Sequence, residues 1–173
     1  MIALTGTPGT GKTSVSWYLN LFFREVVDVN KVAIKYFIIE RDEERDSYII
    51  DIDSLAKYLS KHLPRHSILV GHLSHLLGIC DIVIVLRTYP EELKKRLEAK
   101  GWTPKKVQEN VEAEALGIIT QEALEISKNV FEVNTTRKHP RESFYEVLYV
   151  IRKLPSDYRA PRYDWSEAIL EWY

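Results

Sequence analysis

The chain has 173 residues, a length typical of one globular domain built on one hydrophobic core. Its 24 basic and 25 acidic residues nearly cancel, which argues against a surface that binds nucleic acid over its whole area. A single cysteine, Cys80, excludes an intramolecular disulfide, and no apolar run approaches the length of a membrane span. We therefore expect a cytoplasmic protein without a signal peptide, in which Cys80 is a small core residue.

A glycine-rich stretch follows a short apolar run at the start of the chain. Residues 6–13 have the sequence Gly-Thr-Pro-Gly-Thr-Gly-Lys-Thr, which is a complete P-loop between a predicted strand and a predicted helix. Its glycines let backbone N–H groups turn toward a polyphosphate, and the next helix presents its positive end to the same anion. We predict an ATP site in which Lys12 reaches the β- and γ-phosphates and the Thr13 hydroxyl ligates Mg²⁺. The other predicted ATP-binding residues are Gly9, Gly11 and Ser14.

Three elements are predicted between the P-loop and residue 46. Apolar side chains at helical spacing predict a helix over 15–23, and 26–29 is predicted as a short strand. Asn30 is expected to cap a helix that begins at Lys31. The charge run 40–46 cannot be core and is expected to form a solvated loop.

Two near-continuous runs of β-branched residues are the clearest strands. Residues 67–71 and 81–87 have the pattern of parallel strands that are buried on both faces. Before them, 48–53 is predicted as a short extended segment that leads into an amphipathic helix, and Pro64 ends this helix.

Further helices are predicted in the second half of the chain. Pro90 lies early in one helix, 101–104 interrupts the helical pattern, and one continuous helix is expected from about Lys105 through Ala123. A last strand at 130–133 precedes a closing helix. Strands that alternate with helices predict a parallel α/β sheet.

The final stretch, 155–173, is rich in arginine, tyrosine and tryptophan, and two interpretations stay open. The spacing from Trp165 to Trp172 suits a short helix that docks on the body of the protein, which is the arrangement we expect. Alternatively, its basic and aromatic residues stack on RNA or hold a protein partner.

A P-loop alone indicates a nucleotide and not a reaction. Short insertions after the second and the fourth strand are typical of nucleoside monophosphate kinases. More closely, the chain resembles the adenylate kinase isoenzyme 6 family, also called CINAP-like, which has archaeal members named as adenylate kinases. Besides the P-loop, the segments that carry this resemblance are 42–46 with 50–53, 71–76, 82–88, and 96–102 leading to 108–114.

The resemblance implies a fold, an activity and partners. The implied fold is a nucleoside monophosphate kinase-like P-loop domain over 1–173, with three layers around a central parallel sheet of about five strands. The implied activity is adenylate kinase, in which ATP and AMP give two ADP with Mg²⁺, accompanied by a weak ATPase. The implied role is maturation of the small ribosomal subunit, with a small-subunit ribosomal protein and pre-rRNA as partners. We expect a monomer.

Two segments take functional roles by this resemblance. Residues 30–53 would bind AMP, and residues 99–109 would be a lid over the donor phosphates. Within the first segment, the candidates to contact the AMP phosphate are Lys35, Arg41 and Arg45.

Phosphoryl transfer depends on positioning and on cancelling the charge of the moving group, so cations around it matter most. The predicted catalytic residues are Lys12, His72, Arg87 and Lys100, and Lys100 also belongs to the predicted ATP site. Arg96 is a further candidate cation. A surface arginine at a strand end is the alternative for Arg87, and a solvated helix face is the alternative for Arg96.

The chain departs from the family pattern at two positions. The family places an acid two residues before His72, where it would orient metal-bound water, but this chain has Val70. The candidate replacements are Asp51, Asp53 and Asp81. At the second position, Lys100 replaces a lid arginine, which keeps the charge but loses the bidentate fork.

His72 and His75 are three residues apart, a spacing that can present two metal ligands on one helical face. We do not expect zinc, because no cysteine or carboxylate cluster in the sequence completes four ligands.

Three functions are therefore considered. The first is a Mg²⁺-dependent adenylate kinase. The second is an ATP-gated ribosome assembly factor that binds a ribosomal protein or pre-rRNA with little kinase activity, an interpretation motivated by Val70 and by the tail. The third is a kinase for another small acceptor such as cytidylate.

Overall fold

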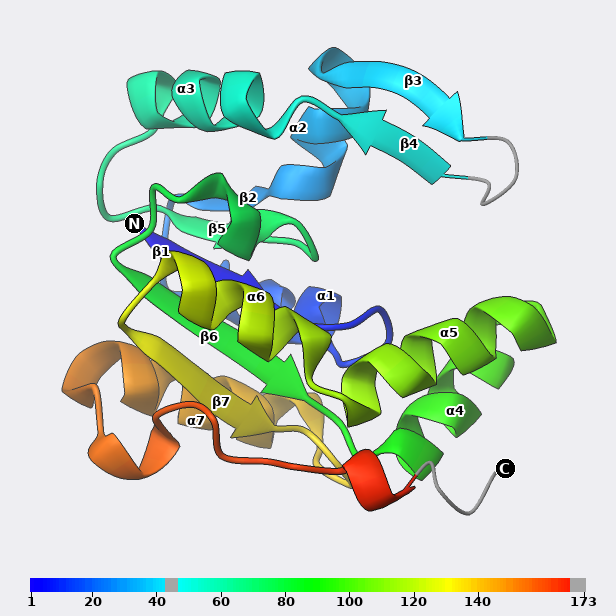
Figure 1. Ribbon diagram of the computed structural model, residues 1–173. Coiled ribbons are helices and arrows are strands. Elements are labelled where there is room, and N and C mark those ends of the chain that lie inside the picture. Colours follow the sequence, from blue (N-terminus) through cyan, green and yellow to red (C-terminus); the bar gives the residue numbers. More distant parts are fainter. Residues whose placement is uncertain (43–46, 169–173) are drawn as a thin grey trace.

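The computed structural model describes residues 1–42 and 47–168, so the predictions for Arg45 and Trp172 lie outside the described residues. Its centre is a five-stranded sheet in the order β2-β5-β1-β6-β7, in which every neighbouring pair is parallel. The strands are β1 (Ile2–Thr5), β2 (Val26–Asp28), β5 (Ile68–Val70), β6 (Ile82–Arg87) and β7 (Val130–Asn134). The predicted parallel α/β sheet is confirmed (Figure 1).

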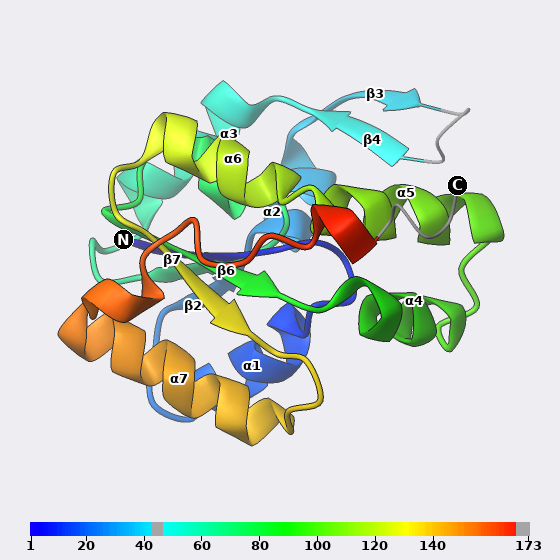
Figure 2. The same cartoon turned by 60° about the horizontal axis from the view of Figure 1, so that its bottom comes forward.

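Helices cover both faces of this sheet, which gives three layers (Figure 2). Helices α1 (Lys12–Leu19) and α7 (Pro140–Lys153) pack on one face. The other face carries α2 (Val29–Tyr36), α3 (Ile52–His62), the 3₁₀ helix η1 (Ser74–Leu77) and α6 (Ile118–Ile126).

Alternation along each strand divides the core between the two faces. Leu4 and Ile84 pack in the cluster that contains α1 and α7. Their neighbours Ala3 and Val83 pack in the cluster that contains α6. Because both sets are buried, the strands read as continuous apolar runs, which is why they were predictable from sequence.

Two helices project from the carboxyl ends of the strands, where they form the right-hand part of Figure 1. They are α4 (Pro90–Glu98) and α5 (Pro104–Ala115), joined by a turn at 99–103. They pack on each other through a cluster of their own, which consists of Leu93, Leu97, Val107 and Val111 with Trp102 against it.

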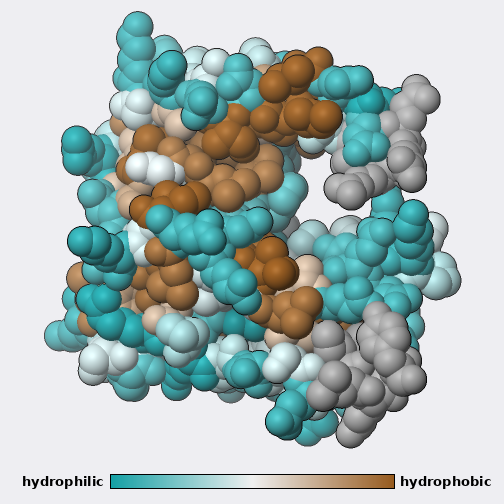
Figure 3. Space-filling view, in the orientation of Figure 1, coloured by the Kyte–Doolittle hydropathy of each residue, from teal (hydrophilic) through white to brown (hydrophobic). Residues whose placement is uncertain are grey.

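A hairpin replaces part of the loop that the charge run predicted. Strands β3 (Ile38–Asp42) and β4 (Ser47–Ile50) pair antiparallel, with Arg41 opposite Tyr48. Most of β3 is exposed, so charged side chains on it stay in water and do not oppose strand formation. In Figure 3, apolar side chains gather on this part of the surface, and the outline is hollowed between the hairpin and α5.

Three helix boundaries differ from the prediction. The helix predicted over 15–23 is α1, which begins at Lys12 and ends at Leu19. The helix expected over 105–123 is two helices, α5 and α6, because Gly117 between them takes the left-handed conformation with φ 65°. Helix α2 begins at Val29, and its cap is Asp28, whose carboxylate accepts from Lys31 N at 3.1 Å. Asn30, expected to be the cap, lies inside the helix.

The described part of the tail docks on the body. After the 3₁₀ helix η2 (Ser156–Tyr158), Arg159 forms a β-bridge with Phe131. Trp165 stacks on Tyr163 at 5.3 Å between ring centroids and meets Tyr89 edge-on. Trp165 therefore docks on the body as predicted, through Tyr89 and Arg87, and the rest of the predicted helix, which contains Ile169 and Trp172, lies outside the described residues. No helix among residues 1–42 and 47–168 is long and apolar enough to cross a bilayer.

Candidate functional site

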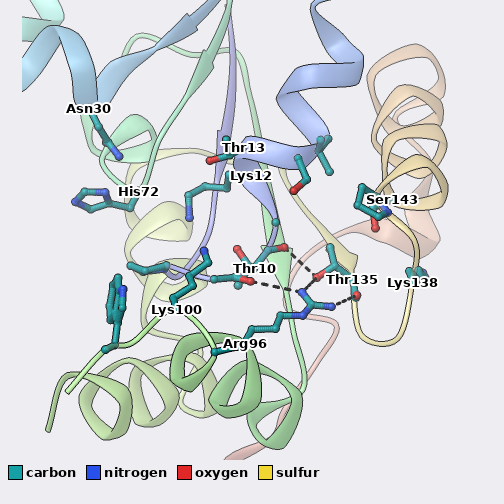
Figure 4. A pocket seen from close by; sticks show the side chains of 18 residues that line it. Thr10, Lys12, Thr13, Asn30, His72, Arg96, Lys100, Thr135, Lys138 and Ser143 are labelled. Carbon is teal, nitrogen blue, oxygen red and sulfur yellow. Dashed lines mark hydrogen bonds between the residues drawn. The ribbon is translucent and has the colours of Figure 1, made fainter. Parts of the chain in front are cut away.

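A cavity of about 660 Å³ opens at the carboxyl end of β1, between the P-loop and helix α4 (Figure 4). Five parts of the chain, far apart in sequence, meet there. Its lining consists of residues 8–15, Asn30, His72, Arg96, Ala99, Lys100, Trp102, Thr135, Lys138, Pro140 and Ser143. The structure therefore brings together Lys12, His72 and Lys100 of the predicted catalytic residues, and also Arg96.

The P-loop lines one wall of this cavity with residues 8–15. Gly11, the residue before α1, is left-handed with φ 98°, and no side chain caps the helix there. The first N–H groups of an α-helix have no acceptor within the helix, so they are left for a ligand. Gly9 has φ 93°, a conformation that L side chains rarely adopt, and a Cβ atom there would lie 2.7 Å from Leu93 Cδ1 of α4. An uncapped, positively polarised helix end of this kind fits an anion such as a phosphate.

Lys12 extends across the loop. Its Nζ donates to the carbonyl oxygens of Gly6 at 2.6 Å and Thr7 at 3.0 Å. Burial lowers the pKa of Lys12 to about 8, an effect that Glu114 opposes and that the neighbouring charge of Lys100 reinforces. The two carbonyl oxygens that Lys12 contacts are neutral, whereas a phosphate would bring a negative charge that stabilises the protonated amine.

Arg96 approaches the loop from α4. Its Nη2 donates to Thr135 O at 2.8 Å, and its Nε donates to Glu92 Oε1 at 3.1 Å within the same helix. Its Nη1 lies 3.5 Å from Gly9 O (Figure 4). Of the two interpretations open for Arg96, the structure supports the cavity position and not a solvated helix face. Lys100 lines the same side from the turn after α4.

The two histidines after β5, His72 and His75, lie in different environments. His72 lines the cavity, and burial together with the charge of Lys12 lowers its pKa, so its imidazole is neutral near pH 7. His75 is directed elsewhere, since its Nδ1 lies 2.9 Å from Thr5 Oγ1 and its Nε2 lies 3.0 Å from Glu122 Oε2. In the described part of the chain, no three His, Cys, Asp or Glu side chains converge as metal ligands do.

None of the candidate replacements for the acid missing at Val70 lines the cavity. Val70 is buried in the core. Asp81 binds the amino terminus of Met1 at 2.6 Å, at the end of the sheet opposite the P-loop. Asp51 caps α3 by accepting from Ser54 N at 3.0 Å, and Asp53 lies in the first turn of that helix. The described residues that line the cavity include no Asp or Glu.

Arg87 does not lie where we predicted. It is 1% exposed, and its Nε donates to Glu114 Oε1 at 2.9 Å while its Nη1 donates to Glu132. The Trp165 ring stacks over its guanidinium, with 4.9 Å between Arg87 Cζ and the ring centroid. It lines a different cavity, of about 590 Å³, between α6 and residues 161–166. The prediction that Arg87 surrounds the moving phosphoryl group is therefore wrong, because its charge is used in a buried ion-pair network.

Glu114 and Glu132, the partners in that network, were missed. A sequence signal exists for both. Glu114 falls at the position after Val107 and Val111 on the buried stripe of its helix, and Glu132 interrupts a buried strand. An acid in an apolar stripe indicates a buried charge with a partner.

The predicted acceptor segment touches the cavity at one point. Of the described part of 30–53, Asn30 alone lines it. Lys35 Nζ lies 4.9 Å from the centroid of the Tyr36 ring, and Arg41 is on the exposed strand β3.

Comparison of the sequence with known proteins shows the family to which this chain belongs. A family model described as an AAA domain matches residues 2–117. The chain is 40% identical to a Methanosarcina barkeri protein named "Putative adenylate kinase", over 98% of this chain and 99% of that one. It is 41% identical to a Thermococcus onnurineus protein of the same name (96% and 92%) and 38% identical to one from Methanocaldococcus jannaschii (99% and 96%).

A solved structure confirms the fold. A sugar kinase from Janibacter sp. HTCC2649 superposes with a TM-score of 0.59 over 90% of this chain and 95% of that chain, at 15% sequence identity. The chain therefore belongs to the AAA-domain family and to the family of the archaeal proteins named as adenylate kinases.

Proposed function

We propose that this protein is an adenylate kinase that transfers the γ-phosphoryl group of ATP to AMP with Mg²⁺ and forms two ADP. The observation that carries the proposal is the arrangement of three cations around the cavity. Lys12 lies on the P-loop side, and Arg96 of α4 and Lys100 of the turn after α4 lie on the opposite side (Figure 4). Phosphoryl transfer needs cations on several sides of the moving group. The identity of about 40% with relatives of that name supports this proposal.

The residues present fit a magnesium nucleotide. The uncapped end of α1 and the donors of Gly9, Gly11 and Ser14 would hold the phosphates, and the Thr13 hydroxyl would ligate the ion. When bound, Mg²⁺ neutralises part of the triphosphate charge. Because no described carboxylate lines the cavity, the remaining ligands would be phosphate oxygens and water.

Each side chain of the cavity then has a role. Lys12 would exchange its carbonyl acceptors for the β- and γ-phosphates. Lys100, with Arg96 behind it, would close on the donor phosphates as part of a lid at 99–109. His72, as a neutral imidazole, would orient the acceptor phosphate. Residues 30–53 would form the AMP side, which Asn30 joins to the cavity.

The CINAP-like resemblance implies two further properties, a weak ATPase and a role in small-subunit maturation with a ribosomal protein and pre-rRNA as partners. Both stay predictions. Co-purification with a small-subunit ribosomal protein, with and without ATP, tests the second.

The lack of a carboxylate in the described cavity lining favours a second candidate function, an ATP-gated binding protein with little turnover. An acceptor panel separates the two. ADP formation is measured with ATP, Mg²⁺ and each of AMP, CMP, GMP and UMP, with Lys12→Ala as the inactive control. Turnover that depends on AMP supports the kinase. ATP binding without turnover on any acceptor supports the binding protein. Turnover with CMP alone would identify CMP, and not AMP, as the acceptor of the kinase.

A further inference from the structure

Thr7 is the centre of the hydrogen bonding inside the P-loop. Its carbonyl oxygen accepts from Thr10 N at 3.2 Å, Thr10 Oγ1 at 2.8 Å and Lys12 Nζ at 3.0 Å. Thr7 is itself 2% exposed. Thr7 therefore links the turn of the loop to Lys12, which the carbonyl oxygen of Gly6 also holds at 2.6 Å.

The side chain of Thr7 is held from outside the loop. Its hydroxyl donates to Glu114 Oε2, 107 residues further along the chain on α5. The other carboxylate oxygen, Oε1, accepts from Arg87 Nε at 2.9 Å and Thr88 N at 2.8 Å. Glu114 is thus fixed on both oxygens, and it ties the base of the α4–α5 pair to the loop.

The anchor is itself braced from the far edge of the sheet. Arg87 donates to Glu132 on β7, and Glu132 Oε2 accepts from the backbone N–H groups of Arg162 and Tyr163 in the tail. Burial raises the pKa of Glu114, and its bonds to Arg87, Thr7 and Thr88 oppose that rise. A buried carboxylate is kept only where such partners hold it.

We propose that Glu114 is a positioning residue for phosphoryl transfer, which acts through Thr7 by fixing the P-loop and Lys12 relative to the helix pair that carries Lys100. This inference rests on the proposed function and deepens it. Glu114 does not line the cavity, so it acts on the nucleotide through the loop.

Loss of the hydrogen bond between Thr7 and Glu114 should lower kcat more than it weakens ATP binding. The backbone donors of the loop survive when Glu114 changes, so binding is largely kept. A reacting group displaced by about 1 Å can cost on the order of a hundredfold in rate.

A double-mutant cycle tests the proposal with Glu114→Gln, which keeps the side-chain size, and Thr7→Val, which removes only the hydroxyl. Each variant should lower kcat by roughly ten- to a hundredfold while the calorimetric Kd for ATP with Mg²⁺ changes less than about threefold. Each change removes the hydrogen bond from Thr7 Oγ1 to the Glu114 carboxylate. Adding Thr7→Val to Glu114→Gln should therefore have no further effect, and the double variant should be no slower than the slower single variant. Rates are divided by the calorimetric stoichiometry, so a smaller folded fraction does not count as slower chemistry.

The matched control is Glu112→Gln, a carboxylate on the same helix that accepts from Gln108 Nε2 and lies outside the cavity lining. It should leave kcat unchanged. Losses that multiply in the double variant, or an unchanged kcat in Thr7→Val, would overturn the proposal. If Glu114→Gln does not fold, Thr7→Val alone decides.

A second measurement separates this proposal from the proposed function. If the wild-type protein shows no turnover with AMP, the kinase proposal fails, and amide hydrogen exchange at Thr10 still tests the anchor. Exchange of this N–H, which is bonded to Thr7 O, should be faster in Thr7→Val and Glu114→Gln than in Glu112→Gln. Equal exchange in all three variants would contradict the inference.

Discussion

Arg87 Nε and Glu114 Oε1 lie 2.9 Å apart where the end of β6 meets α5, and both side chains are almost completely buried. A pair of this kind owes its stability to having every charge matched. The same carboxylate reaches the P-loop through Thr7, so the ion pair joins the core of the sheet to the nucleotide cradle.

Removal of this arginine should destabilise the fold. Arg87→Met keeps much of the side-chain length but leaves the carboxylates of Glu114 and Glu132 buried without their cation, which should cost about 3–5 kcal/mol. The free energy of unfolding in urea measures this. Arg152→Met, at an exposed position on α7, is the control and should change it by less than about 0.5 kcal/mol. A loss for Arg87→Met no larger than the control would contradict the buried network.

Lys100 should matter through its charge. Lys100→Gln keeps a polar side chain but removes the cation from the cavity, and should lower kcat by roughly a hundredfold. Lys100→Arg restores the fork that binds phosphate in two places, and should match or exceed the wild-type rate. Steady-state kinetics with ATP and AMP compare the three proteins. A Gln variant as fast as wild type would remove Lys100 from the reaction.

Cys80 should be an unreactive thiol in the native protein. Burial raises its pKa from 9.0 to about 12, so at pH 8 the reactive thiolate is roughly a thousandfold scarcer than in an ordinary cysteine. Because the folded pKa is the higher one, reactivity should rise only as the pH approaches 12 or as the protein unfolds. The rate of reaction with Ellman's reagent, with and without denaturant, checks this, and equal rates would contradict it.

The sequence predicted those parts of the molecule whose signals are local. The P-loop is a contiguous motif, and β5 and β6 are apolar because both faces of the sheet are covered. The break at Gly117 was missed because the apolar spacing continues across it, and only the left-handed backbone shows that the helix ends there.

The cavity was predictable in part. Lys12, His72 and Lys100 follow motif positions, and the structure brings them together. The role of Arg87 was not predictable, since a strand-end arginine has the same sequence pattern whether it faces a phosphate or a buried acid. Its partners Glu114 and Glu132 lie 27 and 45 residues away, and only the fold brings them to it.

The most direct test of the proposed reaction follows the phosphoryl group itself. The protein is incubated with Mg²⁺, AMP and ATP that carries ³²P in its γ-phosphate, beside the Lys12→Ala variant. We expect labelled ADP to form with the wild-type protein only when AMP is present, and not to form with the variant. Label that stays in ATP, or that appears only as inorganic phosphate, would contradict the assignment of this cavity to transfer between ATP and AMP.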